Sequence, residues 1–277
     1  MEHWKPKGIL AILKESKETF LERERDRDND VPYKLSSNAL TQVRLGSVDD
    51  TLKQRIKEQV KTLINRYKRN REPTGCAWND LDELLETDGF SSLIEGLDEK
   101  AGFYIMPYLL HWQQPRFCDR SQRFQSKYSK EFKRFFREYV DKLTKMYNEI
   151  DKEISFFELN YYKYIEIFKK AAECLENEPV SVAKVLHIIN PKAFIPWDNQ
   201  IAEVFGVEKN AHGYACFSCH IKNWILNNIY VMKLESEDYS VLRILDMAFY
   251  LYANGKIDRN SPLGEGIFSI IREIRLV

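Results

Sequence analysis

The chain has 277 residues, 44% of them hydrophobic, which is enough to bury a substantial core in one large domain or two smaller ones. Lysine plus arginine and aspartate plus glutamate number 42 each, so any surface for nucleic acid must come from local segregation of charge. The sequence contains no apolar run of membrane-spanning length, and its N-terminus lacks the apolar region of a secretory signal. We therefore expect an intracellular protein, cytoplasmic or nucleoid-associated, without a membrane partner.

Five cysteines, an odd number, argue against a disulfide framework and fit a reducing compartment. The string Cys216-Phe217-Ser218-Cys219-His220 matches the attachment pattern of c-type haem, but haem attachment would require export. A structural zinc site would need two separated pairs of ligands, which this spacing lacks. We expect no metal and no other cofactor, and we interpret the cysteines as small residues that pack a helix.

The predicted elements of the N-terminal half are helical. An apolar segment at residues 9–13 passes into a charged, solvated stretch at residues 21–30. Apolar residues at helical spacing then predict a helix from residue 48 or 49 to about residue 69. Residues 101–112 form the most apolar run of this half, and they predict a buried helix with Pro107 in its first turn, because proline would interrupt a central strand.

Between residues 116 and 145, basic side chains alternate with aromatic residues that recur at helical intervals. This pattern predicts an amphipathic helix that buries its aromatic face and exposes a basic one. Such a surface would raise DNA affinity by releasing condensed counterions, although an ordinary solvated helix face explains the same pattern. The candidate DNA-binding residues are Arg116, Arg120, Arg123, Lys127, Lys130, Lys133, Arg134 and Arg137.

The sequence from residue 178 to residue 206 predicts a short apolar helix, a tight connection bounded by prolines, and a further helix. Ser181 is a candidate cap for the first helix, which must end at Asn190-Pro191 because proline lacks a donor and clashes with the preceding turn. Asp198 is placed to cap the next helix, and Gly206 is placed to close it.

Lys184 is expected in the first turn of the apolar helix, where the helix dipole and partial burial both disfavour the ammonium form. A lysine in such a place becomes a nucleophile near neutral pH. The alternative is an exposed lysine whose stem covers apolar surface, and the spacing alone favours this alternative.

The C-terminal residues predict three more helices. The first covers about residues 214–230, and the last covers residues 265–275. Between them, residues 240–253 predict a strongly buried helix that Asn254-Gly255 closes. Arg243 and Asp246 lie three residues apart in this helix and are placed to pair. All the predicted elements are helices, so the expected fold class is all-α.

The central arrangement resembles the helix-hairpin-helix DNA glycosylases, particularly the oxoguanine glycosylase branch, over about residues 155–230. Residues 180–184 lie where that family has its hairpin and catalytic lysine. Pro196-Trp197-Asp198 lies where the family has a proline and its catalytic aspartate, and Gly213-Tyr214-Ala215 is also similar. The resemblance implies a helical N-terminal region, residues 1–114, packed on a helix-hairpin-helix-like region, residues 115–277.

The resemblance further implies binding of damaged duplex DNA and excision of an extruded base, with an oxidised purine as the first expectation. Lys184 would attack the sugar carbon that bears the base, and Asp198 would stabilise developing positive charge. His187 and Ile188 would flank the base pocket. Because the hairpin glycines of the family are absent, the alternative is a catalytically silent helical module that binds DNA or another protein.

Overall fold

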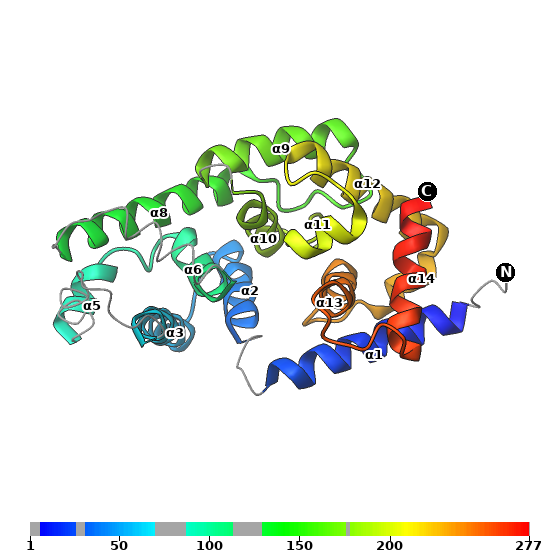
Figure 1. The fold of residues 1–277 in the computed structure, drawn as a ribbon. Coiled ribbons are helices and arrows are strands. Elements are labelled where there is room, and N and C mark those ends of the chain that lie inside the picture. Colours follow the sequence, from blue (N-terminus) through cyan, green and yellow to red (C-terminus); the bar gives the residue numbers. More distant parts are fainter. Residues whose placement is uncertain (1–5, 26–30, 70–86, 113–128, 176–177, 277) are drawn as a thin grey trace. The chain divides into compact units, whose positions relative to one another are not determined.

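The computed structural model describes residues 6–25, 31–69, 87–112, 129–175 and 178–276 (Figure 1). Within these residues every regular element is a helix, which confirms the all-α fold. The chain forms two compact units, and unit 1 joins residues 1–28 to residues 150–277, whereas unit 2 covers residues 29–149. A single boundary near residue 115 does not describe this division, because the first helix packs with the C-terminal half of the chain.

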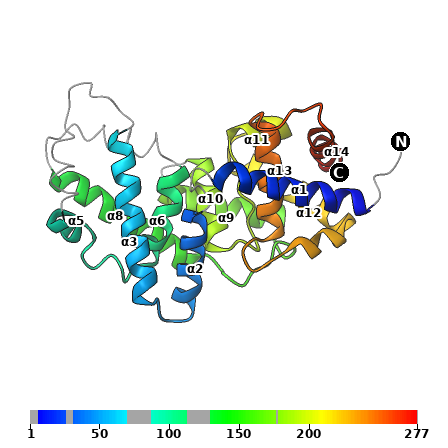
Figure 2. The same ribbon diagram turned by 90° about the horizontal axis from the view of Figure 1, so that it is seen from below.

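Unit 2 is built around α6 (Ala101–Trp112), which is buried along nearly its whole length. Pro107 lies inside this helix and not in its first turn, since the helix begins at Ala101. Helix α6 packs against α2, α3 and α8, and Figure 2 shows α2, α3 and α6 side by side. The other helices of the unit are α2 (Val31–Arg44), α3 (Asp50–Arg69), α5 (Thr87–Ile94) and α8 (Ser129–Glu149).

The contact between α6 and α8 depends on Gly102. A Cβ atom at this position would lie 2.1 Å from the carbonyl oxygen of Val140, so no larger residue fits without moving the helix backbones apart. The Gly102 N–H also donates to the Thr144 Oγ1 at 3.0 Å. The predicted burial of the aromatic face is confirmed for Phe135, Phe136 and Tyr139 of α8.

Unit 1 contains the first helix and all the helices after residue 150. Helix α9 packs on α10 and α12, α11 packs on α13, and α13 packs on α1 and α14. None of the helices in the described ranges has the length and apolar character needed to cross a membrane. The helices of this unit are α1 (Pro6–Arg25), α9 (Tyr161–Cys174), α10 (Pro179–Ile189), α11 (Asn199–Phe205), α12 (Ala211–Asn227), the 3-10 helix η1 (Ile229–Leu234), α13 (Val241–Ala253) and α14 (Pro262–Leu276).

Candidate functional site

Helix α10 carries Lys184, and its start differs from the expected one. The helix begins at Pro179, which suits a first helical position because its φ angle is fixed and its missing N–H would be unused there. The expected cap by Ser181 is therefore wrong, since this residue lies inside the helix and is buried. Lys184 lies in the second turn instead of the first, where the field of the helix dipole has largely decayed.

Lys184 is a charged residue in a buried helix. Every α10 residue from Ser181 to Ile189 is buried, and Lys184 itself is only 7% exposed. A lysine buried among apolar residues needs charged or polar neighbours to offset the loss of hydration. The interpretation of Lys184 as an exposed lysine is therefore wrong.

Asp198 caps α11 as the sequence predicts. Its Oδ1 accepts a hydrogen bond from the Ile201 N–H at 2.8 Å, and its Oδ2 accepts one from the Asn254 Nδ2 at 3.4 Å. Asn254 is the C-cap residue of α13, so the carboxylate joins the start of one helix to the end of another. The predicted end of α11 at Gly206 is also confirmed, with the glycine in the left-handed region at φ 68°.

Helix α13 supplies two further buried charges. Arg243 Nη1 donates to Asp246 Oδ2, which confirms the predicted pair, and the two residues are 2% and 6% exposed. The guanidinium group of Arg243 also lies over the Phe20 ring of α1, 5.1 Å from the ring centroid. These contacts place an ion pair in the interior of unit 1.

The electrostatics of Asp246 connect this ion pair to the two candidate catalytic residues. Desolvation raises the pKa of Asp246 to about 6, and the negative charge of Asp198 acts in the same direction. The positive charges of Arg243 and Lys184 lower the pKa and so oppose this rise. The charges of Lys184 and Asp198 thus both affect the pKa of one buried carboxyl group. We call Lys184, Asp198, Arg243 and Asp246 the buried charge cluster, in which Asp198 is half-buried and the other three residues are buried.

The connection from α10 to α11 is fixed by side chains from three helices. The Tyr164 hydroxyl of α9 donates to the Ala193 carbonyl at 3.4 Å, and the Tyr214 hydroxyl of α12 donates to the Ile195 carbonyl at 2.9 Å. Burial raises the pKa of both phenols, which keeps them protonated and able to donate. A connection held in this way fixes Asp198 relative to Lys184.

His187 supplies the third of these hydrogen bonds. Its Nδ1 lies 2.7 Å from the Phe194 carbonyl oxygen, which can only accept, so Nδ1 carries the proton. Burial lowers the pKa of His187 to about 3. Ile188 is also buried, at 3% exposure. Both residues expected to flank a base pocket therefore lie in the core of unit 1, and their contact with a base stays a prediction.

The candidate DNA-binding residues are only partly described. Arg116, Arg120, Arg123 and Lys127 lie outside the described residues, as does the side chain of Lys130. The three remaining side chains all make contacts within unit 2. Lys133 donates to the Ser92 hydroxyl, Arg137 donates to the Ser92 and Glu95 carbonyl oxygens at 3.1 and 2.9 Å, and Arg134 lies 3.8 Å from Glu138.

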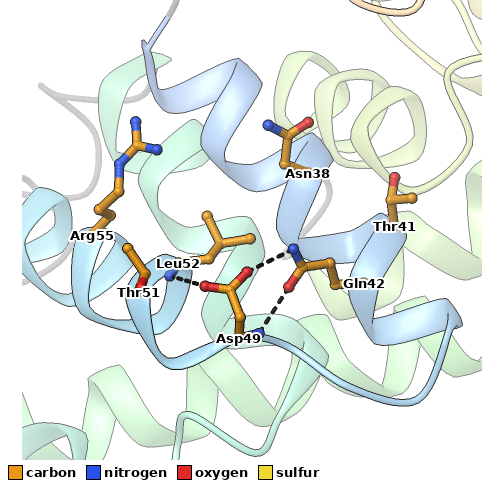
Figure 3. Close-up of a pocket in the computed structure, with 7 residues that line it drawn as sticks. All are labelled: Asn38, Thr41, Gln42, Asp49, Thr51, Leu52 and Arg55. Carbon is orange, nitrogen blue, oxygen red and sulfur yellow. Dashed lines mark hydrogen bonds between the residues drawn. The ribbon is translucent and has the colours of Figure 1, made fainter.

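A polar groove of about 390 Å³ lies in unit 2, where α2 ends and α3 begins (Figure 3). Gln42 Nε2 donates to Asp49 Oδ2 at 2.8 Å, and the Asp49 N–H donates to Gln42 Oε1 at 2.9 Å. Asp49 Oδ1 accepts from the Leu52 N–H at 2.8 Å, so the same carboxylate caps α3. These hydrogen bonds hold the turn between the helices. The lining residues are Asn38, Thr41, Gln42, Asp49, Thr51, Leu52 and Arg55.

The cysteines of α12 are free thiols. Cys216 and Cys219 are half-buried, and burial raises the pKa of Cys219, which opposes formation of the thiolate that a metal would need. Over the part of the chain that the structure describes, no three His, Cys, Asp or Glu side chains are placed to hold a metal ion.

The sequence matches no model of a protein family, and neither a curated protein nor a solved structure matches the chain. The function is therefore argued from the buried charge cluster. Sequence reasoning identified Lys184, Asp198 and the Arg243–Asp246 pair, but it did not assign the pair to the site. The sequence feature that could have marked this pair as part of the site is the occurrence of two opposite charges in an otherwise apolar helix.

Proposed function

We propose that the protein excises a base from damaged DNA by lysine-dependent glycosylase and lyase chemistry. Lys184 is the nucleophile, and Asp198 is the carboxylate that stabilises positive charge. The supporting observation is that Lys184 is a buried lysine, only 7% exposed, in the same unit as Asp198, whose carboxylate caps α11 and binds Asn254 of α13. An amine in a largely apolar interior suits nucleophilic chemistry, because burial disfavours the charged form of an amine.

In the proposed reaction, Lys184 Nζ forms a bond to the sugar carbon C1′ of an extruded nucleotide. The glycosidic bond breaks, and its electron pair leaves on the base. Asp198 stabilises the positive charge that develops on the sugar. Proton loss from the new C–N centre and opening of the sugar ring give an imine, from which strand cleavage can follow. By the resemblance, the proposed base is an oxidised purine.

Borohydride trapping tests this chemistry because it reduces an imine to a permanent protein–DNA adduct. We expect the wild-type protein to be trapped on a duplex with an abasic site or an oxidised purine, and Lys184→Gln to give no adduct. Lys169→Gln is the matched control, since Lys169 is exposed on α9. Asp198→Asn should trap far more slowly while keeping the α11 cap, because asparagine caps a helix about as well as aspartate. No adduct across a panel of lesions, or equal trapping by Lys184→Gln, would contradict the proposal.

A catalytically silent DNA-binding module is the second candidate function. It is favoured by the 7% exposure of Lys184 and by the composition of the buried charge cluster, which contains two basic and two acidic residues, one of each joined in the Arg243–Asp246 ion pair. Such a cluster is also consistent with a purely structural ion network. In this case the chain would bind DNA through its basic residues and would not cleave it.

Fluorescence anisotropy with duplex DNA over a salt series tests the binding surface shared by both candidates. Changing Arg116, Arg120, Arg123 and Lys127 to Gln should weaken binding, and the slope of log K against log salt should fall by about 0.9 for each lost phosphate contact. A control with four lysines of unit 1 changed to Gln removes the same charge elsewhere; these are Lys163, Lys169, Lys170 and Lys209. Equal affinity and slope in the folded first variant would reject this surface.

A further inference from the structure

The polar groove between α2 and α3 has a chemistry that the proposed base excision does not use. Its volume of about 390 Å³ lies within the range of small-molecule sites in proteins, about 300–1,000 Å³. We propose that this groove binds a zwitterionic peptide of two or three residues, whose carboxylate pairs with Arg55 and whose ammonium group pairs with Asp49. All the lining residues belong to unit 2, whereas Lys184 belongs to unit 1, so peptide binding does not depend on base excision.

Two rows of side chains form the walls of the groove. Asp49, Leu52 and Arg55 follow one another at intervals of three residues from the N-cap of α3, so they share one side of this helix. Asn38 and Gln42 lie four residues apart on α2 and therefore share one face as well. Figure 3 shows the two rows on opposite sides of the groove. Leu52 is buried, so apolar surface separates the charges of Asp49 and Arg55.

The Asp49 end of the groove is held in place before any ligand binds. Asp49 accepts hydrogen bonds from the Leu52 N–H and from Gln42 Nε2, and its own N–H donates to Gln42 Oε1 (Figure 3). The hydrogen bond from Leu52 and then that from Gln42 lower the pKa of Asp49, so the carboxylate is charged at neutral pH. A carboxylate has about four lone-pair sites, so an ammonium group can bind Asp49 without displacing these donors.

Arg55 provides the opposite charge at the other end of the groove. It makes neither an ion pair nor a hydrogen bond with another residue that the structure describes, so its N–H donors are available to a ligand. A planar guanidinium group binds a carboxylate through two parallel hydrogen bonds. Asn38 faces the groove from α2 (Figure 3), and its side-chain amide can donate to and accept from the peptide bond of the ligand.

The two charges determine which kind of ligand fits. A simple anion such as phosphate is repelled by Asp49, and a simple cation is repelled by Arg55, whereas a zwitterion is attracted at both ends. The nearby Asp50 is paired with Lys53 at 3.5 Å, so it adds little net charge.

The spacing of the charges determines the length of the ligand. Asp49 and Arg55 are 55 − 49 = 6 residues apart, which corresponds to a rise of about 9 Å along a helix. An extended peptide advances about 3.3–3.6 Å per residue, so the terminal charges of two or three residues lie a similar distance apart. The apolar surface of Leu52 between the charges suits a peptide with an apolar side chain.

Binding of the dipeptide glycyl-leucine to the full-length protein, followed by proton–nitrogen NMR, tests the proposal. We expect saturable shifts of the side-chain amides of Asn38 and Gln42. N-acetyl-glycyl-leucine lacks the ammonium group, and glycyl-leucine amide lacks the carboxylate. Each modified peptide should bind about fivefold or more weakly than glycyl-leucine, because each loses one charge-assisted contact.

Matched variants connect each end of the peptide to one residue. Arg55→Gln should weaken binding of glycyl-leucine by about fivefold or more and leave binding of glycyl-leucine amide unchanged. Asp49→Asn should weaken binding of glycyl-leucine and leave that of the N-acetyl form unchanged, because asparagine keeps the α3 cap without the charge. Arg134→Gln removes an exposed guanidinium group elsewhere in unit 2 and should bind as the wild type does.

The comparison of the three peptides uses the wild-type protein, so it remains valid where a variant fails to fold. Absence of saturable shifts at Asn38 and Gln42, equal affinities for glycyl-leucine and its two modified forms, or tighter binding of inorganic phosphate would overturn the proposal. A folded Arg55→Gln protein that loses the same affinity for glycyl-leucine and for its amide would also overturn it, since the carboxylate would then not be the partner of Arg55.

Discussion

At the residue scale, His187 links the pH of the solution to the stability of unit 1. Burial lowers its folded-state pKa to about 3, whereas an unfolded histidine titrates near 6.5. Its contribution to stability is therefore complete above pH 6.5 and is lost as the pH falls toward 3. Asp246 has the opposite effect, because its pKa is raised from 3.8 to about 6, so its contribution is complete below pH 3.8 and is lost as the pH rises through 6.

Replacing His187 by asparagine separates these two effects. Asparagine keeps a donor near the position of Nδ1 but does not titrate, so the variant retains the Asp246 contribution and loses that of His187. Urea unfolding at pH 7 and pH 5 should show that the wild type loses about 2 kcal/mol more than His187→Asn over this interval. His212→Asn removes an exposed histidine of the same unit and should behave as the wild type. Parallel pH responses of wild type and His187→Asn would contradict a neutral buried imidazole.

At the element scale, the start of α12 depends on the absence of a side chain at Gly213. A Cβ atom there would lie 1.8 Å from the Glu208 carbonyl oxygen, and the Gly213 N–H donates to the capping Asn210 Oδ1 at 2.9 Å. Gly213→Ala should therefore lower the free energy of unfolding by more than about 2 kcal/mol, measured by urea denaturation. Asn223→Ala, at an exposed site of the same helix, should change it by less than about 0.5 kcal/mol. Equal losses of unfolding free energy in the two variants would contradict this prediction, because they would show that the loop before α12 can move to accept the new side chain.

Helix ends and ion pairs within one helix were predictable where residues close in sequence determine them. The Asp198 cap, the end at Gly206 and the Arg243–Asp246 pair all depend on neighbours in sequence, and each is confirmed. The Ser181 cap is wrong because Pro179 competes for the start of the same helix. The junction between Asp198 and α13 could not be predicted, since it results from tertiary packing of α11 on a helix that lies far away in the chain.

At the scale of the whole molecule, unit 1 is discontinuous in sequence. Phe20 of α1 is buried, and its ring meets Tyr250 of α13 edge-on at 5.8 Å while also facing the Arg243 guanidinium. The resemblance implies a single boundary near residue 115, and nothing in the local pattern of residues 6–25 identifies the distant partners of this helix. The helices themselves follow from periodicity, but their assignment to units depends on contacts between remote segments.

Phe20→Ala should destabilise unit 1 by about 3–5 kcal/mol, because it leaves a cavity and removes both ring contacts. Hydrogen exchange read by mass spectrometry should then show lost protection in α13 and α14, although the substitution lies more than two hundred residues away in sequence. Phe136→Ala, at an equally buried site in α8, is the matched change in unit 2 and should lower protection in α6. Loss of protection confined to α1 after Phe20→Ala would contradict the division into units.

The discontinuity of unit 1 also affects how the chain folds during synthesis. Helix α1 ends at residue 25, and α13 begins at residue 241, so the 215 residues 26–240 must be translated between them. Translation proceeds at about 5–20 residues per second, so α1 is synthesised roughly ten to forty seconds before α13. During this interval unit 2, whose residues are contiguous, can complete its own core. The apolar side chains of Ile9, Leu13 and Phe20 meanwhile stay available to a chaperone or to a neighbouring nascent chain.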